Sequence, residues 1–202
     1  MEDCIFANML KKISESNLDT IYGRARFVSY KNNQGQFSHA FIYGKVNNQQ
    51  NVFCRLHSAC ITSETFFAIN CDCREQLIKS FQYCQKKGGI IIYLEQEGRG
   101  NGIEAKLKQI ELETKRNIDT ITAFKKAGYP LDNRTYEDAV YILKDQQVRS
   151  IILYTASPKK MEDLQKKGIN ISKRIYFKLK IKHRQALKNI KAKQRYLGYF
   201  SS

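Results

Sequence analysis

The chain is organised around one stretch, which reads Arg55-Leu-His-Ser-Ala-Cys60 and then Cys71-Asp-Cys73. Its three cysteines lie within fourteen residues, and Cys71 and Cys73 are separated by a single residue. Three thiolates can bind a zinc ion and leave its fourth position for water, as in catalytic zinc sites. The alternative is that these cysteines are small buried apolar side chains. The spacing predicts a metal site, and the open position favours a catalytic role.

The residues before the first thiol predict β-structure. Three short runs rich in β-branched and aromatic residues, divided by Asn-Asn-Gln-Gly and Asn-Asn-Gln-Gln turns, lie at residues 24–30, 38–46 and 52–57. Runs of this kind predict an antiparallel meander, which would deliver Arg55, His57 and Ser58 to a strand end. Upstream, only a short amphipathic piece around Met9 to Ile13 stands out.

The residues after Cys73 predict a helix, a strand and a glycine-rich loop. Apolar residues recur at helical spacing up to Cys84, and Gly88 ends the pattern. Residues 89–94 form a continuous apolar run, which predicts a buried parallel strand. It leads into Gln96-Glu-Gly-Arg-Gly-Asn-Gly102, whose alternate glycines would let the backbone approach a phosphate, with Arg99 as counter-charge. Alone this is a weak motif, because it lacks the lysine of a P-loop.

A second strand-to-helix unit follows at residues 150–154. Ser157 is placed as a helix N-cap and Pro158 as the first helical residue. Lys159 and Lys160 would then lie at a helix N-terminus, where the dipole disfavours cations unless an anion is bound. The pair indicates an anion site or, alternatively, a solvent-facing pair of lysines.

Together these elements predict an α/β fold: a mixed or mostly parallel sheet flanked by helices and opened by an N-terminal antiparallel meander. We expect one domain over residues 1–202, with residues 173–202 as a basic C-terminal segment. Ligands of such sheets bind beyond the carboxyl ends of the strands, where the motifs above fall.

Charge and composition bear on partners and compartment. The formal charge is +16, and twelve Lys and Arg but no Asp or Glu follow Asp163. Such a tail favours polyanions or is a solvated basic face. No apolar run approaches a membrane span and no signal peptide is evident, so we expect a cytoplasmic protein without membrane contact. Cys4, Cys54 and Cys84 are expected to be ordinary thiols.

Five motifs occur in the order and near-spacing of GTP cyclohydrolase II, the first enzyme of riboflavin synthesis. They are Arg55 to Cys60, Cys71-Asp-Cys73, Gln96-Glu-Gly-Arg99, Asp132-Asn-Arg134 and Ser157-Pro-Lys-Lys160. The chain resembles that family from about Tyr22 to Tyr199. The resemblance implies a homodimer that hydrolyses GTP, releasing formate and pyrophosphate to give 2,5-diamino-6-(5-phosphoribosylamino)pyrimidin-4(3H)-one.

The resemblance also implies roles for particular residues. Cys60, Cys71 and Cys73 match the zinc ligands, and Mg²⁺ would accompany the nucleotide. The residues that match nucleotide contacts are Arg55, Leu56, His57, Ser58, Ala59, Gln76, Glu97, Gly98, Arg99, Thr120, Thr155 and Lys160. Asp132 matches a proposed base and Arg134 a proposed nucleophile at the α-phosphate. Because arginine normally stays protonated, the alternative for Arg134 is a bidentate phosphate clamp. The alternative for Asp132 is a helix N-cap, since residues 133–143 look helical.

Several positions depart from the family pattern. Ala59 replaces a glutamate, Glu95 an arginine and Asn133 a glutamate. Ile110 stands where the family has a catalytic tyrosine, although an alignment shifted by one residue would place Glu111 there. Ile110 shares a helix face with Ile103 and Leu107 and is expected to be core.

Two alternatives to the complete reaction remain at this point. A divergent relative would stop at a formamidopyrimidine nucleotide, because isoleucine cannot pass the proton that tyrosine would. A zinc-stabilised nucleic-acid-binding module is disfavoured, because such a module has no need of Asp132, Arg134 and three thiols together.

Overall fold

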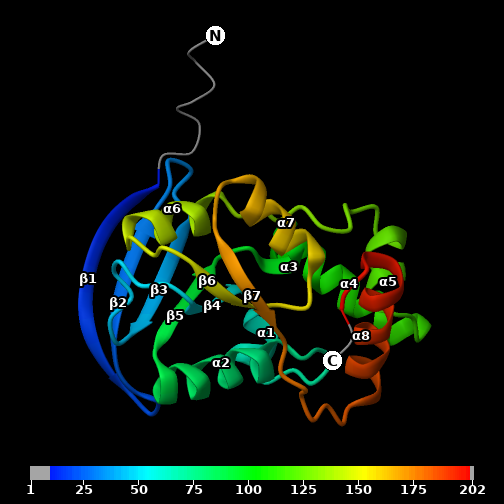
Figure 1. The fold of residues 1–202 in the computed structure, drawn as a ribbon. Helices are drawn as coiled ribbons and strands as arrows, with labels where there is room; N and C mark the ends of the chain where they lie inside the picture. The colour runs from blue at the N-terminus through cyan, green and yellow to red at the C-terminus, as the bar shows by residue number, and fades with distance from the viewer. Residues whose placement is uncertain (1–9, 201–202) are drawn as a thin grey trace.

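The computed structural model describes residues 10–200 as a seven-stranded mixed sheet with helices on both faces (Figure 1). The strands are β1 (Lys11–Thr20), β2 (Gly23–Lys31), β3 (Phe37–Tyr43), β4 (Val52–Ser58), β5 (Gly89–Leu94), β6 (Ile151–Tyr154) and β7 (Ile171–Ile175). Their order across the sheet is β1-β2-β3-β5-β4-β6-β7. β5, β4, β6 and β7 run parallel, and β1, β2 and β3 add an antiparallel section at one side. The predicted α/β class with a mixed sheet is confirmed.

The antiparallel meander differs from the predicted one in its membership. Residues 52–57 belong to β4, which pairs in parallel with β5 and β6, whereas β5 pairs with β3. β4 is buried on both faces, as a central parallel strand must be, so its placement in the meander was wrong. The meander gains β1 instead, which is exposed over nearly its whole length and therefore has no apolar alternation to predict it. Met9 lies outside the described residues.

Two cores hold helices against the two faces of the sheet. The helices are α1 (Ile61–Glu64), α2 (Cys73–Lys87), α3 (Glu97–Gly100), α4 (Gly102–Arg116), α5 (Thr120–Lys126), α6 (Glu137–Asp145), α7 (Pro158–Lys166) and α8 (Arg184–Leu197). On one face, Leu56 and Ile92 share a buried cluster with Ile142 of α6 and Leu164 of α7. On the other face, α2 packs aromatic and apolar side chains against Phe53 and its neighbours. Figure 1 shows α6 and α7 on the side of the sheet opposite α2.

The predicted helix ends were confirmed in two places and wrong in a third. α2 ends at Lys87 with Gly88 as its C-cap, and the Ser157 hydroxyl accepts from the Lys160 amide at the start of α7. The helix expected from residue 133 begins only at Glu137, because residues 132–136 form no regular secondary structure.

The apolar face expected on α4 is not core. Ile103 is 46% exposed and Leu107 is 54% exposed, while Ile110 is half-buried.

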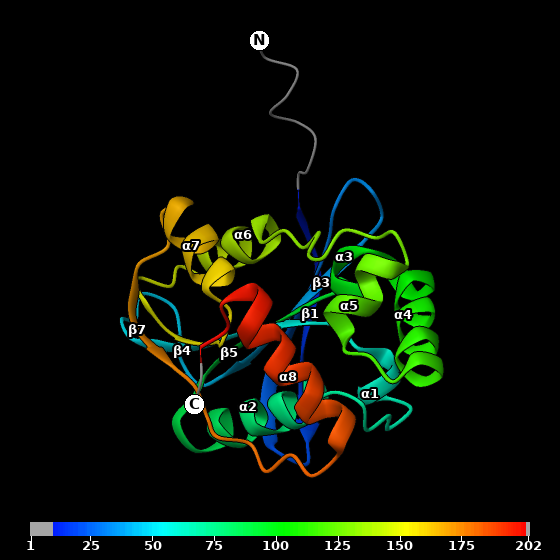
Figure 2. The ribbon, with the colours of Figure 1, turned by 90° about the vertical axis from the view of Figure 1, so that its right-hand side faces the viewer.

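The basic C-terminal segment ends in α8, which crosses the structure between α5 and α2 (Figure 2). Asn189 accepts from the Thr120 amide (2.8 Å) and donates to the Asn70 carbonyl (3.0 Å). Lys193 forms an ion pair with Asp72 at 3.2 Å. These contacts fasten α8 over the end of the sheet where the motif residues gather. No helix within residues 10–200 is long and apolar enough to cross a membrane.

Candidate active site

Two adjoining cavities lie at the carboxyl ends of β4, β5 and β6. The first, which we call the cysteine pocket, is lined by Cys60, Cys71, Cys73, Glu97, Arg99, Lys106, Gln109 and Thr120, among others. The second, which we call the cationic pocket, is lined by Arg55, His57, Gln76, Thr155, Ser157 and Lys160, among others. Both are lined by Ser58, Cys73, Arg134, Lys193 and Tyr199. The shared wall makes the two cavities one bipartite site.

The cysteine triad has the geometry of a metal site. Cys60 precedes α1 as its N-cap and Cys73 begins α2, so two helix starts fix the thiols. The three sulfurs lie within 4.8 Å of one another, and the Cys60 and Cys71 sulfurs are 3.7 Å apart. Sulfurs bound tetrahedrally at the usual zinc distance would be about 3.8 Å apart. Hydrogen bonds from Cys60 and Cys73 lower the pKa of Cys71, so the cluster already favours a thiolate. The residues present therefore fit a thiophilic cation.

α4 supplies two further polar groups to the cysteine pocket. Burial opposes the charge of Lys106, but the neighbouring thiolates raise the pKa of its ammonium above the usual value. Gln109 is 1% exposed, and its side-chain oxygen has no hydrogen-bond partner among the described residues. The cysteine pocket thus offers an ammonium group and a free amide oxygen beside the metal ligands.

The cationic pocket is built by the ends of β4 and β6 and by the start of α7. Arg55 donates to the Tyr154 carbonyl (3.2 Å) and to Gln76, and its guanidinium lies 4.9 Å from the Tyr154 ring centroid. Lys160 donates to the Leu56 carbonyl at 2.8 Å, and burial holds its pKa well below the usual value. A bound anion would offset that burial.

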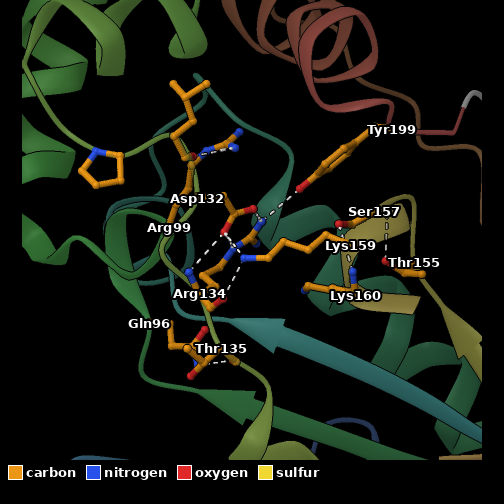
Figure 3. Close-up of polar contacts among 12 residues, drawn as sticks. Gln96, Arg99, Asp132, Arg134, Thr135, Thr155, Ser157, Lys159, Lys160 and Tyr199 are labelled. Atoms are coloured by element: carbon orange, nitrogen blue, oxygen red, sulfur yellow. Dashed lines mark hydrogen bonds and ion pairs between the residues drawn. The ribbon is translucent and has the colours of Figure 1, made fainter. Parts of the chain in front are cut away.

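Asp132 and Arg134 form a bidentate ion pair at the shared wall (Figure 3). The Asp132 carboxylate accepts from the Arg134 Nε at 2.9 Å and from its Nη2 at 2.5 Å, and the Lys159 ammonium lies 3.9 Å away. Burial would raise the pKa of Asp132, but Arg134 lowers it to about 2. Burial likewise opposes the charge of Arg134, yet the neighbouring acidic groups, Tyr199, Tyr136 and Asp132, raise its pKa well above the usual value. Asp132 therefore orients a guanidinium that stays protonated, and it caps no helix, which corrects the N-cap alternative.

The glycine-rich loop, residues 96–102, packs against the segment that carries Arg134. Gly100 has φ +81°, and a Cβ there would lie 2.8 Å from the Asn133 carbonyl. Asn133 also donates to the Arg99 carbonyl at 2.9 Å. Glycine is thus required at position 100 because the backbone of Asn133, next to Arg134, passes so close to it. Arg99 itself adopts a left-handed conformation (φ 59°), which is strained for a side chain of its size and turns its guanidinium into the cysteine pocket.

Not every residue implied by the family resemblance reaches a cavity with its side chain. Leu56 is fully buried in the core, so it offers only its carbonyl, to Lys160. Glu97 lines the cysteine pocket, but its carboxylate accepts from the Ile61 amide (2.7 Å) and the Gly98 amide (2.9 Å). His57 is buried against Glu64 at 2.7 Å, and burial lowers its pKa to about 4, so it is neutral at neutral pH.

Ile110, the residue at the position of the family tyrosine, does not face the cysteine pocket. Ile110 lines a separate, mostly apolar cavity with Phe66, Ile69 and Glu113. Glu111, the residue one further along, pairs with Lys115 at 2.5 Å on the exposed side of α4. Neither side chain lines the cysteine pocket.

Sequence reasoning missed the contribution of the C-terminal segment. Asn189, Lys193 and Tyr199 all line the site, although they lie in a region that composition alone marked only as basic. The one available signal was that the family resemblance extended to Tyr199. The remaining two cysteines within the described residues, Cys54 and Cys84, are buried away from the triad, and Cys4 lies outside those residues.

An α/β fold with clustered thiols beside a cationic pocket is typical of enzymes that act on anionic substrates with the help of a metal ion. A sequence model of the GTP cyclohydrolase II family matches residues 11–176. The chain therefore belongs to the GTP cyclohydrolase II family, which confirms the predicted family and enzyme class.

Individual relatives agree with this placement. The chain is 34% identical to the GTP cyclohydrolase-2 of Picrophilus torridus over 168 residues, which cover 83% of this chain and 87% of that protein. It is 37% identical to the GTP cyclohydrolase-2 of Campylobacter fetus, with 81% and 83% covered. It is also 37% identical to the riboflavin biosynthesis protein RibBA of Chlorobium phaeovibrioides, covering 84% of this chain but only 42% of that relative. α8 lies beyond the residues that the family model matches.

Proposed function

We propose that this protein hydrolyses GTP, opening the imidazole ring with release of formate and pyrophosphate to give 2,5-diamino-6-(5-phosphoribosylamino)pyrimidin-4(3H)-one. The observation that carries the proposal is the shared wall: Cys73 and Arg134 line both cavities. A thiolate pocket requires a cation, and a cationic pocket requires an anion. A purine nucleotide beside a zinc ion satisfies both, with the base in one cavity and the phosphates in the other.

Cys60, Cys71 and Cys73 would hold the zinc ion. Bound zinc lowers the pKa of a coordinated water to about 7 and so supplies a nucleophile for C8 of the guanine. Gln109 and Thr120 face the same cavity and can orient the base, since both carry hydrogen-bonding groups. The Glu97 carboxylate stays where two backbone amides hold it, at the rim of this cavity.

The triphosphate belongs in the cationic pocket. Arg55 supplies positive charge, Lys160 would gain it once a bound anion offsets its burial, and the start of α7 points backbone amides toward the same space. Outside the cysteine triad, residues 10–200 contain no other group of three close metal-ligating side chains. Mg²⁺ would therefore enter with the nucleotide, bound chiefly by its phosphates.

Arg134 takes the role of a phosphate clamp. A nucleophilic arginine would have to lose its proton, whereas the ion pair with Asp132 and the raised pKa of Arg134 keep it cationic. A guanidinium fixed in this way can stabilise the charge that develops on the α-phosphate. Asp132, with its pKa lowered to about 2, is a weak base and acts by positioning Arg134.

An early stop at the formamidopyrimidine nucleotide is the alternative that one observation favours. α4 presents Lys106 and Gln109 to the cysteine pocket but no hydroxyl, because Ile110 faces the neighbouring apolar cavity. A nucleic-acid-binding role has less support, since Lys193 is engaged with Asp72 and Lys188 with the Asn117 carbonyl (2.9 Å).

The deciding experiment incubates the protein with GTP, Zn²⁺ and Mg²⁺ and identifies products by mass spectrometry. The complete reaction yields one formate and one pyrophosphate per GTP consumed. Accumulation of a ring-opened nucleotide that keeps its formyl group would select the early stop. No consumption of GTP by the metal-loaded protein would refute both.

A further inference from the structure

Tyr199 is placed in the wall between the two cavities by three contacts at the end of α8. Gly198 adopts a left-handed conformation (φ 62°) and ends the helix there. The Tyr199 amide donates to the Lys193 carbonyl (3.3 Å), and the next amide, of Phe200, donates to the Ala156 carbonyl (2.9 Å). Arg174 covers the Phe200 ring at 4.0 Å from its centroid. The C-terminal turn is thus tied to the loop between β6 and α7, which fixes the direction of the Tyr199 ring.

The Tyr199 hydroxyl accepts one hydrogen bond, from the Arg134 Nη2 at 3.1 Å. Within residues 10–200 this is the one hydrogen bond that its oxygen makes, so its own hydrogen has no acceptor there. Figure 3 shows the hydroxyl directed at the Asp132–Arg134 pair. Tyr199 lines both cavities, so its hydroxyl group adjoins the space that a substrate would fill.

The charges around the hydroxyl are mostly positive. Arg134 comes from the segment before α6, Arg99 from α3 and Lys193 from α8, and Asp132 is the carboxylate paired with Arg134. Burial would raise the pKa of Tyr199, but these three cations lower it to about 8. By contrast, burial raises the pKa of the nearby Tyr154 to about 12. A phenol of this kind gives up its proton readily, and the phenolate left behind is stabilised by the same cations.

We propose that Tyr199 is a catalytic proton donor to the departing pyrophosphate, a role that rests on the function proposed above. In the proposed function Arg134 clamps the α-phosphate, and its Nη2 lies 3.1 Å from the Tyr199 hydroxyl, so that hydroxyl would lie beside the phosphate that the clamp binds. In this role a phenol hydroxyl of the shared wall lies where the leaving group acquires negative charge.

The step balances with water as the nucleophile. A water oxygen forms a bond to the α-phosphorus, and the bond from that phosphorus to the oxygen bridging to the β-phosphate breaks. The bridging oxygen keeps the electron pair and takes the proton of the Tyr199 hydroxyl, and pyrophosphate leaves. The attacking water loses a proton to solvent, and the phenolate regains one from solvent, which restores the phenol.

The test compares three proteins loaded with Zn²⁺ and Mg²⁺: the unaltered chain, Tyr199→Phe and Tyr196→Phe. The first variant keeps the ring and removes only the hydroxyl. Tyr196 lies three residues earlier, in the last turn of α8, is 45% exposed and lines neither cavity, so it is the matched control. Pyrophosphate and formate are measured in the same reactions between about pH 6 and pH 10, a range that brackets the lowered pKa of Tyr199, about 8.

We expect Tyr199→Phe to lower kcat for pyrophosphate release by about a hundredfold or more, with a small change in KM, because a positioned proton donor typically contributes that much. The unaltered protein and Tyr196→Phe should lose this activity as the pH rises through about 8, since the donor must be protonated. Tyr199→Phe should lack this alkaline limb.

The outcomes separate this role from the proposed function. If the unaltered protein releases no pyrophosphate from GTP, the proposed function fails and the role fails with it. Pyrophosphate release by Tyr199→Phe at the unaltered rate overturns the role and leaves the proposed function standing. A slower variant that keeps the alkaline limb also overturns it, because the hydroxyl would then act only in positioning Arg134.

Discussion

The two cavities of the site are opposites in charge and in origin. The cysteine pocket is framed by helix starts and by α4, and its central groups are three thiols that bind tightly only when a cation replaces their protons. The cationic pocket is framed by strand ends and α7, and its central groups are cations with few acids among them. The cysteine pocket therefore suits a cation, and the cationic pocket suits an anion.

The difference in charge shows how the two ends of one substrate can undergo different reactions in one site. The base end of a nucleotide needs an activated water, and the phosphate end needs fixed positive charge and a proton donor. In the proposed function, the wall that includes Cys73, Arg134, Lys193 and Tyr199 would hold the two ends of one nucleotide in separate cavities. A substitution in one cavity should therefore lower the release of one product, formate or pyrophosphate, more than that of the other.

The largest effect is expected from Cys71→Ser. Two thiols without the third cannot complete the site, so zinc content should fall to background and formate release should become undetectable. Metal content by mass spectrometry and formate by an enzyme-coupled assay check this. Cys84→Ser, which changes a buried thiol away from the site, should behave as the unaltered protein. Full formate release by a zinc-free Cys71→Ser protein would exclude the triad from the reaction.

Arg134→Ala should break the other cavity. Removing one preorganised donor to a developing charge lowers kcat by about a hundredfold to a thousandfold, and pyrophosphate release should fall by that factor. Arg134→Lys keeps the charge but loses the bidentate geometry. Its rate of pyrophosphate release should lie between the rates of Arg134→Ala and the unaltered protein. Zinc content should stay unchanged in both variants. Equal pyrophosphate release by Arg134→Ala and the unaltered protein would remove Arg134 from the mechanism.

Gly100→Ala should disturb the wall itself. The added Cβ would overlap the Asn133 carbonyl at 2.8 Å, in a backbone conformation unfavourable for alanine. We expect the free energy of unfolding to fall by about 3 kcal/mol, measured by chemical denaturation. Gly102→Ala is the control, because it has a similar φ of +86° but open space around the new Cβ. It should lose only about 1 kcal/mol, the strain of the left-handed conformation. Equal losses in the two variants would show that the contact with Asn133 is not what requires glycine.

The last prediction concerns the stability contributed by Glu113, behind the cysteine pocket. Burial raises its pKa from 4.5 to about 7, so its protonated form is favoured in the folded state. Its contribution to stability is then present below about pH 4.5 and lost as the pH rises through about 7. Glu113→Gln should remove this slope, a change of about 3 kcal/mol in the free energy of unfolding between those values. Glu111→Gln, on the exposed side of α4, should keep the slope. An unchanged slope in Glu113→Gln would show that another group titrates.

Local sequence predicted the elements whose residues satisfy a local rule. Ser157 and Pro158 start a helix through a cap and a preset backbone angle, and the apolar run of β5 can only be a buried strand. The placement of β4 could not be predicted this way, because its pairing depends on β5 and β6, which lie far away in the chain.

The sequence predicted the site residues that are close together in the chain. It missed those that reach the site from a distant part of the chain. Cys60, Cys71 and Cys73 are close in sequence and close in space. Lys193 and Tyr199 reach the same site from α8 through contacts with Asp72 and Arg134. No pattern within α8 itself distinguishes these residues from its other basic and aromatic residues.

The most direct test of the division between the cavities measures pyrophosphate and formate in parallel from Cys71→Ser supplied with GTP and Mg²⁺. The account predicts that this variant forms no formate but releases pyrophosphate within about tenfold of the unaltered rate, because Arg134, Lys160 and Tyr199 remain in place. Loss of pyrophosphate release to the same extent as formate, in a folded variant that still binds GTP, would contradict it.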